Sequence, residues 1–390
     1  YKATTSNDSV AIGNAAMNRN TTGNNNTAIG LSALEQNTTA SENTAVGHSA
    51  LEENTTGQQN CALGFRALEA NTTAGENTAL GHEALKSNTT ATQNTAVGAD
   101  ALKAATTGAS NVAMGFQSLK TITTGTNNVA IGWKALAFGG INSDNDVAIG
   151  YQALMNNNND RNVAVGANAL RENTGGADNT AVGYNALVAN TTGNDNTAIG
   201  EAALSNTTTG DNNQAIGHNA GLNITTGFSN ICIGEAAGDS ITTGNYCVML
   251  SNDADVSGGG AERQIVVGET TCGGNNQFKV RASSGCFNTN NTSTWNTTSD
   301  RRIKKNIVDN TVGLDKINQL RVRNFEYRTP DEIDYTEFAD GTNPKAIPID
   351  KKGVQLGVIA QEIVEVFPDV VESSSTGVKT VNPDNLTWYL

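Results

Sequence analysis

A single pattern of small, aliphatic and polar residues repeats through the first two thirds of the chain. Its phase marker is a glycine that follows an alanine and an aliphatic residue, and this glycine recurs every 17 residues from Gly13 to Gly132. The interval grows to 18 residues at Gly150 and shrinks to 16 at Gly166, so the phase is regained and the repeat continues to Gly268. A fixed period of this length is the signature of a solenoid, in which each repeat forms one coil.

The repeat has the consensus N-T-A-[IV]-G-x-x-A-L-x-x-N-T-T-G-x-x, as in NTAVGHSALEENTTGQQ. Glycine and threonine recur every eight or nine residues, and helices that short and that poor in helix formers are not stable. The pattern instead predicts two short strands per repeat, one around N-T-A-I and one around A-L-x-x-N, separated by glycine turns. We therefore expect a mainly β protein whose 17-residue coils stack as a flattened β-solenoid, or β-roll.

Two rows of large apolar residues are expected to form a thin core. The residue before the marker glycine is nearly always aliphatic, the residue four positions after it is usually leucine, and small alanines between them let the two walls approach. The residue four positions before the glycine is asparagine in twelve of sixteen coils, which predicts a hydrogen-bonded asparagine ladder. The aliphatic row begins with Ile12, Ile29 and Val46, the leucine row with Leu34, Leu51 and Leu68, and the ladder with Asn26, Asn43 and Asn60.

Each coil offers little apolar surface to bury. Seventeen residues contribute about one isoleucine or valine, one leucine and two or three alanines. This burial is weak against an ordering cost of ~1–2 kcal/mol per residue. Apolar burial between chains would make up the deficit, so we expect a homotrimer rather than a lone solenoid. At ~4.8 Å per coil, sixteen coils would form a rod of roughly 75 Å.

Composition and charge exclude several classes of function. The chain has 390 residues and a net charge of −14 at pH 7, and no run of basic residues. This argues against nucleic-acid binding and against attraction to an anionic membrane surface. No apolar stretch approaches the ~18–20 residues of a transmembrane helix, so we expect no membrane insertion. The five cysteines match no metal-ligand spacing, and we expect neither a cofactor nor a bound metal.

Two further features leave alternatives open. His48, His82 and His218 each follow a marker glycine. In a trimer they would form metal-binding rings of three or simply lie exposed on turns, and the absence of an H-x-H motif favours exposed turns. The Asn/Asp-rich segment 141–162 coincides with the phase slip. It is interpreted either as a calcium or receptor loop or, more simply, as a decorated surface bulge.

The chain changes character after the repeat, because all five prolines lie beyond residue 329. We divide it into a solenoid shaft at 1–270, a neck or cap at 271–298 with one strand in F-K-V-R-A, and a small α+β domain at 299–390. The last part predicts a short helix, two strands, a second helix and a final strand. These elements are expected at 312–320, 321–328, 354–360, 360–367 and 377–383.

The repeat over residues 5–270 resembles the β-roll head of trimeric autotransporter adhesins, whose consensus also centres on A-I-G-x-x-A. The period here is longer than in that family, so the coil shape is expected to differ. The same extended repeat is similar to the shafts of phage tail fibres. Both resemblances imply a trimeric fibre.

Three motifs near the C-terminus carry a second resemblance. SDRRIKKNI, GLDKINQLRVRNFEY and GVIAQEIVEVFPDVV occur in this order within 299–390. Together they resemble the intramolecular chaperone, or S74 peptidase, domain of phage tail fibres, tailspikes and endosialidases. Domains of that family trimerise, help the preceding fibre to fold and often cut themselves off. Ile303 stands where the family more often has leucine, and the family continues into a longer C-terminal helix than this sequence contains.

This resemblance implies that Ser299 is a nucleophile and Lys304 its general base, and that the bond between Thr298 and Ser299 is cut. A serine hydroxyl needs a base to become a nucleophile, and a Ser–Lys pair can replace Ser–His–Asp. The lysine must be neutral to accept a proton, so burial would have to lower its pKa well below ~10.4. The alternative interpretation is a solvated basic turn that opens the domain.

These observations lead to three hypotheses of different classes. The first is a phage tail fibre in the virion, a homotrimer that binds a glycan or protein receptor on the host surface and contacts other virion tail proteins. The second is a cellular trimeric adhesin on a bacterial surface, without cleavage activity. An adhesin of the autotransporter type needs a C-terminal membrane anchor, where this chain carries the three motifs instead. The third is a protein whose only activity is the proteolysis of its own chain.

Overall fold

The computed structural model describes residues 8–140, 142–280, 286–288, 319–326, 353–373 and 379–381. The chain divides into two compact units, Tyr1–Thr297 and Thr298–Leu390, which are considered separately below. The finer division into shaft, neck and terminal domain stays a prediction.

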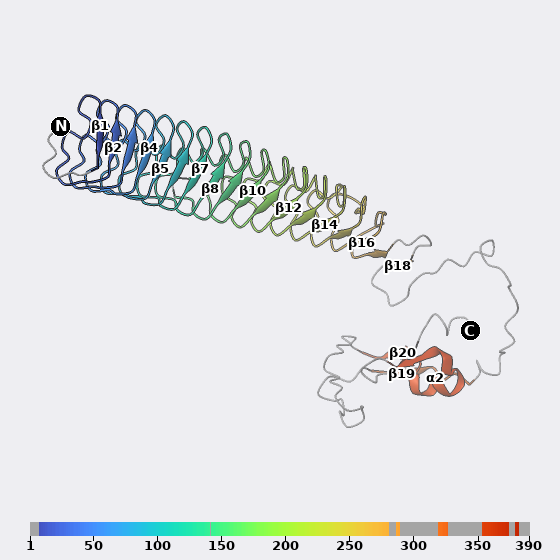
Figure 1. Ribbon diagram of the computed structural model, residues 1–390. Coiled ribbons are helices and arrows are strands. Elements are labelled where there is room, and N and C mark those ends of the chain that lie inside the picture. The colour runs from blue at the N-terminus through green and yellow to red at the C-terminus, as the bar shows by residue number, and fades with distance from the viewer. Residues whose placement is uncertain are drawn as a thin grey trace, which may run out of the picture. The chain divides into compact units, whose positions relative to one another are not determined.

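The first unit is a β-solenoid of sixteen coils with one three-residue strand per coil, and the strands follow one another along one side of the stack (Figure 1). The predicted fold, a mainly β solenoid of 17-residue repeats, is confirmed. The strands are β1 (Val10–Ile12), β2 (Thr27–Ile29), β3 (Thr44–Val46), β4 (Cys61–Leu63), β5 (Thr78–Leu80), β6 (Thr95–Val97), β7 (Val112–Met114), β8 (Val129–Ile131), β9 (Val147–Ile149), β10 (Val163–Val165), β11 (Thr180–Val182), β12 (Thr197–Ile199), β13 (Gln214–Ile216), β14 (Ile231–Ile233), β15 (Val248–Leu250) and β16 (Ile265–Val267).

The strands pair in parallel, and each residue faces its equivalent in the next coil. Val10 pairs with Thr27, for example, and Ile12 with Ile29. The phase slip leaves this register intact, because Val147 pairs with Val129 on one side and with Val163 on the other. The extra residue of the 18-residue interval and the missing residue of the 16-residue interval therefore lie outside the strands.

The second strand predicted in each coil is wrong. The A-L-x-x-N segment forms turns in which two residues per coil are left-handed, such as Ser32 (φ 55°) and Leu34 (φ 51°). Alternating backbone of this kind cannot extend as a strand, although it still bonds to the next coil: the N–H of Leu34 donates to the carbonyl oxygen of Ala50 (3.1 Å). Burial of a leucine, at ~1.5–3 kcal/mol, offsets the ~1–2 kcal/mol cost of left-handed backbone.

The core contains only one of the two apolar rows that the pattern predicted. Leu34 and its equivalents are fully buried, together with the central alanine of β2 to β13, such as Ala28. Ile12 and Ile29, which precede the marker glycine, are exposed at 58% and 37%. Side chains alternate across a strand, so an inward central alanine turns both flanking residues outward. The prediction that the aliphatic row is buried is therefore wrong.

The asparagine ladder is confirmed. In a typical step, the backbone N–H of Asn43 donates to Oδ1 of Asn26 (2.9 Å), and Nδ2 of Asn43 donates to the carbonyl oxygen of Gly57 (2.9 Å). A second ladder runs through the asparagine of the N-T-T motif, where Nδ2 of Asn37 donates to Oδ1 of Asn20 (2.9 Å). Both rows are buried. They satisfy polar groups that a thin apolar core would otherwise leave unpaired.

The marker glycine sets how closely successive coils approach. Gly47 has φ +138°, and a Cβ atom built on it would lie 2.4 Å from the carbonyl oxygen of Gly64. A side chain at this position is excluded both by the backbone conformation and by the neighbouring coil. The close approach explains why the row is almost entirely glycine.

The end of the first unit departs from the repeat. β17 (Phe278–Val280) still pairs in parallel with β16, and β18 (Cys286–Asn288) turns back to pair antiparallel with β17. The strand predicted in F-K-V-R-A is thus confirmed as β17.

The described residues of the second unit form two strand pairs and a helix. β19 (Arg323–Phe325) pairs antiparallel with β20 (Gln355–Gly357), and β21 (Val371–Ser373) with β22 (Lys379–Val381). The helix α2 (Ala360–Val366) and the 3-10 turn η5 (Pro368–Val370) contribute the buried cluster Ile363, Phe367 and Val370. The predicted strands and second helix are confirmed here, whereas most of the helix expected at 312–320 lies outside the described residues.

We predict that Gly47→Ala lowers the free energy of unfolding by more than ~3 kcal/mol, because the new methyl group collides with the next coil. The measurement is denaturant or thermal unfolding followed by circular dichroism. Gly258→Ala is the matched control, since nothing lies within 4 Å of a Cβ there, and it should change stability by less than ~0.5 kcal/mol. Equal stability of the two variants would contradict the role assigned to the marker glycine.

Candidate functional site

The outward side of the sheet is the first candidate surface. We call it the strand face, and it consists of the first and last residues of β1 to β16, two positions in each of sixteen strands, or 32 in all. None of these 32 residues is charged, although the chain carries −14. The last-position row is aliphatic or methionine throughout. Its exposed members include Leu63 (44%), Met114 (42%) and Ile216 (42%).

Aromatic and histidine side chains stack in the row that follows the marker glycine. Trp133 stacks on Tyr151 with ring centroids 4.9 Å apart and on Phe116 at 6.3 Å. Phe65 is stacked between His48 and His82, at 5.3 and 5.2 Å. These rings lie one coil apart along the solenoid, and the predicted exposure of His82 agrees with the structure. The question of metal rings between chains is not tested by a single chain.

His82, Glu83 and Asp100 form a group whose ligand atoms all lie within 4.8 Å of one another. Lys103 and Lys86 already pair with Glu83, the latter at 3.0 Å. Hydrogen bonds from these two ammonium groups lower the pKa of Glu83 to about 2. Two cations thus balance the carboxylate without a metal ion, and the group acts as an ion-pair network that joins neighbouring coils.

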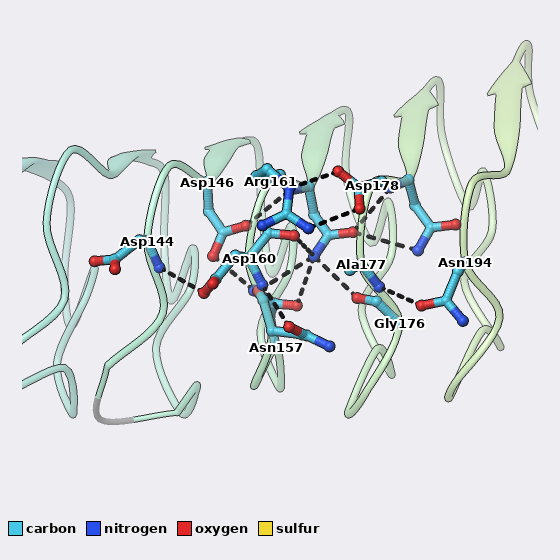
Figure 2. A network of polar contacts seen from close by, with 12 residues as sticks. Asp144, Asp146, Asn157, Asp160, Arg161, Gly176, Ala177, Asp178 and Asn194 are labelled. Atoms are coloured by element: carbon cyan, nitrogen blue, oxygen red, sulfur yellow. Dashed lines mark hydrogen bonds and ion pairs between the residues drawn. The ribbon is translucent and has the colours of Figure 1, made fainter.

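The phase slip contains a buried acidic residue, Asp146, which is labelled in Figure 2. Asp146 occupies the place that asparagine holds in the neighbouring coils, between Asn128 and Asn162. Its Oδ2 accepts a hydrogen bond from Nδ2 of Asn157 (2.7 Å), and its Oδ1 accepts one from the backbone N–H of Asn162 (2.9 Å). Both carboxylate oxygens therefore act as acceptors.

The slip explains why an acceptor is needed there. In a regular coil the two ladders share a carbonyl group: Nδ2 of Asn26 and Nδ2 of Asn37 both donate to the carbonyl oxygen of Ala40. At the slip Asn157 belongs to the second ladder and donates directly to Asp146 of the first. An asparagine at position 146 would have only one side-chain oxygen. Its NH2 group would then face one of the two N–H donors, from Asn157 or Asn162, and could not accept a hydrogen bond from it.

The environment of Asp146 raises its pKa to about 8, mainly through burial, while the hydrogen bond from the Asn162 backbone opposes the shift and the nearby charge of Asp160 adds to it. The guanidinium of Arg161 pairs with a different carboxylate, that of Asp178: Nε lies 2.7 Å from Oδ1 and Nη2 lies 2.8 Å from Oδ2. This pair also lowers the pKa of Asp178.

Two other carboxylates of segment 141–162 accept hydrogen bonds from backbone N–H groups. Oδ1 of Asp144 accepts from the N–H of Thr126 (2.6 Å), and Oδ1 of Asp160 accepts from the N–H of Asp144 (2.9 Å). They therefore join successive coils rather than converge on a cation (Figure 2). Among the residues that the structure describes, these carboxylates are built into the stack of coils rather than carried on the expected surface bulge.

We predict that Asp146 makes the solenoid less stable as the pH rises. The folded protein holds a proton on Asp146 up to a pH of about 8, whereas the unfolded chain releases it near 4. The contribution of this group to the free energy of unfolding is therefore highest below pH 4 and decreases as the pH rises from about 4 to 8. Between pH 5 and pH 8 the decrease is on the order of 4 kcal/mol.

Urea unfolding of the wild type and of Asp146→Asn at pH 5, 7 and 9 would measure this contribution. The variant should show a smaller decline between pH 5 and 9; a part remains, because burial also raises the pKa of the Cys232 thiol and of the Asp239 carboxyl. Asp195→Asn, which changes an exposed carboxylate in another coil, should keep the full decline. A decline of the same size in Asp146→Asn would show that other groups cause it.

The predicted catalytic residues Ser299 and Lys304, and the predicted cleavage position after Thr298, lie outside the described residues. Their mutual geometry therefore stays a prediction. Within the same unit, Arg323 of β19 forms a two-bond ion pair with Glu362 of α2, at 2.8 and 3.1 Å. This pair fixes the helix to the strand pair at its exposed side.

Sequence reasoning missed two features of these sites. The outward orientation of the aliphatic row was missed because size was taken as a sign of burial. Asp146 was passed over inside an Asn/Asp-rich segment, although it is the one acidic residue in the row of the asparagine ladder. An alignment of the repeats, compared position by position, would have found it.

Within the described part of the chain, no helix is long and apolar enough to cross a membrane.

Comparison with known proteins gives one match. Residues 299–372 match the peptidase S74 family, described as the chaperone of endosialidase. No curated protein and no solved structure matches the chain. The matched segment includes β19, β20 and α2 of the second unit. The chain thus combines a β-solenoid of 17-residue repeats with a C-terminal segment, residues 299–372, that is similar to the peptidase S74 family.

Proposed function

We propose that the chain is the subunit of a trimeric phage tail fibre, whose solenoid shaft serves host attachment and whose C-terminal domain assists its assembly. The observation that carries this proposal is the uncharged strand face, which runs through all sixteen coils. A monomer would leave this face in water along its whole length. Contiguous apolar surfaces of that extent mark interaction sites.

The size of the strand face suits association between copies of the chain. Sixteen coils at ~4.8 Å and strands about 10 Å long give a face of roughly 750 Å², close to the ~800 Å² that each partner contributes to a standard interface. Identical acidic chains repel each other unless the surfaces that meet are free of charge. The strand face meets this condition, so the partner we propose is another copy of the same chain.

The family match supports an assembly role for the second unit. A domain at one end of a long repeat can hold three chains together before their strand faces meet. Closed symmetry of this kind is typical of homo-oligomers. The proposed fibre lies in the virion, contacts other tail proteins and binds a glycan or protein on the host surface. It binds no nucleic acid and does not insert into a membrane.

A cellular trimeric adhesin on a bacterial surface would use the same strand face. We favour the phage fibre because the three motifs within 299–390 resemble the chaperone domains of phage tail fibres and tailspikes.

Self-cleavage is the second part of the proposal. Oγ of Ser299 would attack the carbonyl carbon of Thr298 while Lys304 takes the hydroxyl proton. The C–N bond breaks as that proton passes to the Ser299 nitrogen, which leaves an ester between the two residues. Water then hydrolyses the ester and releases Thr298 as a free carboxylate. Lys304 acts as base and then as acid, as in other Ser–Lys sites.

We predict that the purified wild-type chain yields a fragment ending at Thr298 and that Ser299→Ala and Lys304→Met do not. Intact-mass spectrometry measures this directly. Lys305→Met is the matched control, because it removes the neighbouring positive charge and leaves the proposed base in place. Cleavage that persists in Ser299→Ala would exclude the proposed nucleophile, and a full-length mass in every sample would mean that the domain is retained.

The native Cys61 reports on the trimer, because its free thiol is exposed on the strand face of a single chain. If three strand faces meet, Cys61 becomes buried, and we predict that it reacts with a maleimide at least roughly tenfold more slowly than an exposed thiol. The comparison is Cys61→Ser/Thr56→Cys, which moves the thiol to an exposed corner of the coil. Equal rates, together with a monomeric mass by light scattering, would contradict the trimer.

A further inference from the structure

The two rows of the strand face differ in one respect. The last-position row is aliphatic or methionine in every coil, whereas the first-position row changes in blocks. It is threonine in β2, β3, β5 and β6, with Cys61 in β4, and it is valine in β7 to β10. It returns to threonine in β11 and β12 and to glutamine in β13, and it is isoleucine or valine in β14 to β16.

At the two inner block boundaries the solenoid itself gives no reason for the change. Thr95 and Val112, on either side of one boundary, are both half-buried, and so are Val163 and Thr180 at the next. Valine and threonine have the same shape and both suit strands. A single chain therefore provides the same burial on both sides of these two boundaries. The difference points to a partner that covers the face.

A uniform row cannot define where two copies align. If one chain slides by one coil against another, the aliphatic last-position row meets an equivalent aliphatic row. The first-position row does not, because each block boundary then sets a hydroxyl or amide group against an aliphatic side chain. A polar group buried without a partner costs ~1–3 kcal/mol. The boundaries are Val10/Thr27, Thr95/Val112, Val163/Thr180 and Gln214/Ile231.

Copies that are level avoid this cost. Threonines at one height can hydrogen-bond to each other, as in cross-strand threonine pairs, and valines bury apolar surface against valines. The valine block of β7 to β10 also coincides with the stacked rings of Phe116, Trp133 and Tyr151. These coils are therefore the most distinctive segment of the shaft.

We infer that the first-position row of the strand face sets the axial register between copies of this chain, with a second and a third copy as its partners. The inference rests on the proposed trimer and adds the residues that specify how its shafts align. The uniform row supplies apolar burial, and the block pattern supplies the alignment.

The test removes the pattern while it keeps the face apolar. A filled variant carries valine at the first position of β2 to β6 and of β11 to β13, including Cys61→Val in place of the serine that the other labelled chains carry there, so that no block boundary remains. The matched control changes Val46, Val97, Val165 and Val182 of the other row to isoleucine, which adds apolar surface without altering the pattern. A second variant serves if the filled one aggregates: valine is changed to threonine in β1 and β7 to β10, and isoleucine or valine to threonine in β14 to β16, so that the row is polar throughout and again has no block boundary.

Full-length chains would be spin-labelled at position 56 in the background Cys61→Ser/Cys286→Ser/Thr56→Cys, and distances between labels measured by pulsed electron resonance. Light scattering on the same samples gives the number of chains. A level three-fold trimer has one label-to-label distance, whereas slipped copies add longer distances that differ in height by multiples of ~4.8 Å.

We expect one narrow distance in the wild type and in the isoleucine control, and several distances in the filled variant, which should still be trimeric. A trimeric filled variant with one unchanged distance would overturn the inference and leave the trimer standing. Monomers in the wild type would overturn the proposed trimer and with it the inference. The second variant should broaden the distances in the same direction, and an unchanged distance there counts against the inference as well.

Discussion

The hydrogen bond between successive coils is the constraint on which the rest of the first unit depends. It places each residue beside the residue that holds the same place one coil away, at a spacing of ~4.8 Å. The side chains at equivalent positions of successive coils must therefore be able to stack on one another. Asparagine does so because its amide both donates and accepts, as Asn43 and Asn60 show. Alanine and leucine do so by packing. Like charges do so only beside counterions: Glu83 and Asp100 hold the same place in successive coils, and Lys103 pairs with both.

The same constraint explains the composition of the core. Because coils approach closely at the marker glycine, the space inside a coil admits a leucine and small residues only. The strand contributes its central alanine, and its larger neighbours are turned outward. The leucine reaches the core from a left-handed backbone position, which repeats with little variation from Leu34 to Leu204. Where leucine is replaced, as at Gly238, a nearby isoleucine such as Ile241 fills the space. Apolar burial is thus limited by geometry, and the surplus apolar residues remain on the strand face.

Features that follow from the period could be predicted from the sequence, and features that follow from local backbone geometry could not. The period alone indicates the solenoid, the asparagine ladder and the cancelling phase slip. The second strand was wrong because left-handed residues such as Ser32 leave no trace in the pattern of apolar positions. The core was assigned to the wrong row because Ile29 is larger than Ala28, although the alternation of a three-residue strand allows only one of them inside. The acceptor role of Asp146 depends on how the slip displaces a carbonyl group, which no motif encodes. The roles assigned to Ser299 and Lys304 rest on the resemblance of one sequence motif alone.

A repeat of this kind also explains why an assembly domain is useful at its end. Natural sequences fold reliably when one arrangement lies well below its competitors. Sixteen nearly equivalent coils provide many arrangements of similar energy, because a strand face can meet a partner at the wrong height and still bury apolar surface. Partially assembled chains would also expose apolar surface and an open sheet edge, which favours aggregation. A domain that joins three chains at one end fixes the point from which contact spreads along the shaft. In the proposed fibre, the C-terminal domain brings the chains together at one end, and contact between the strand faces then extends along the shaft.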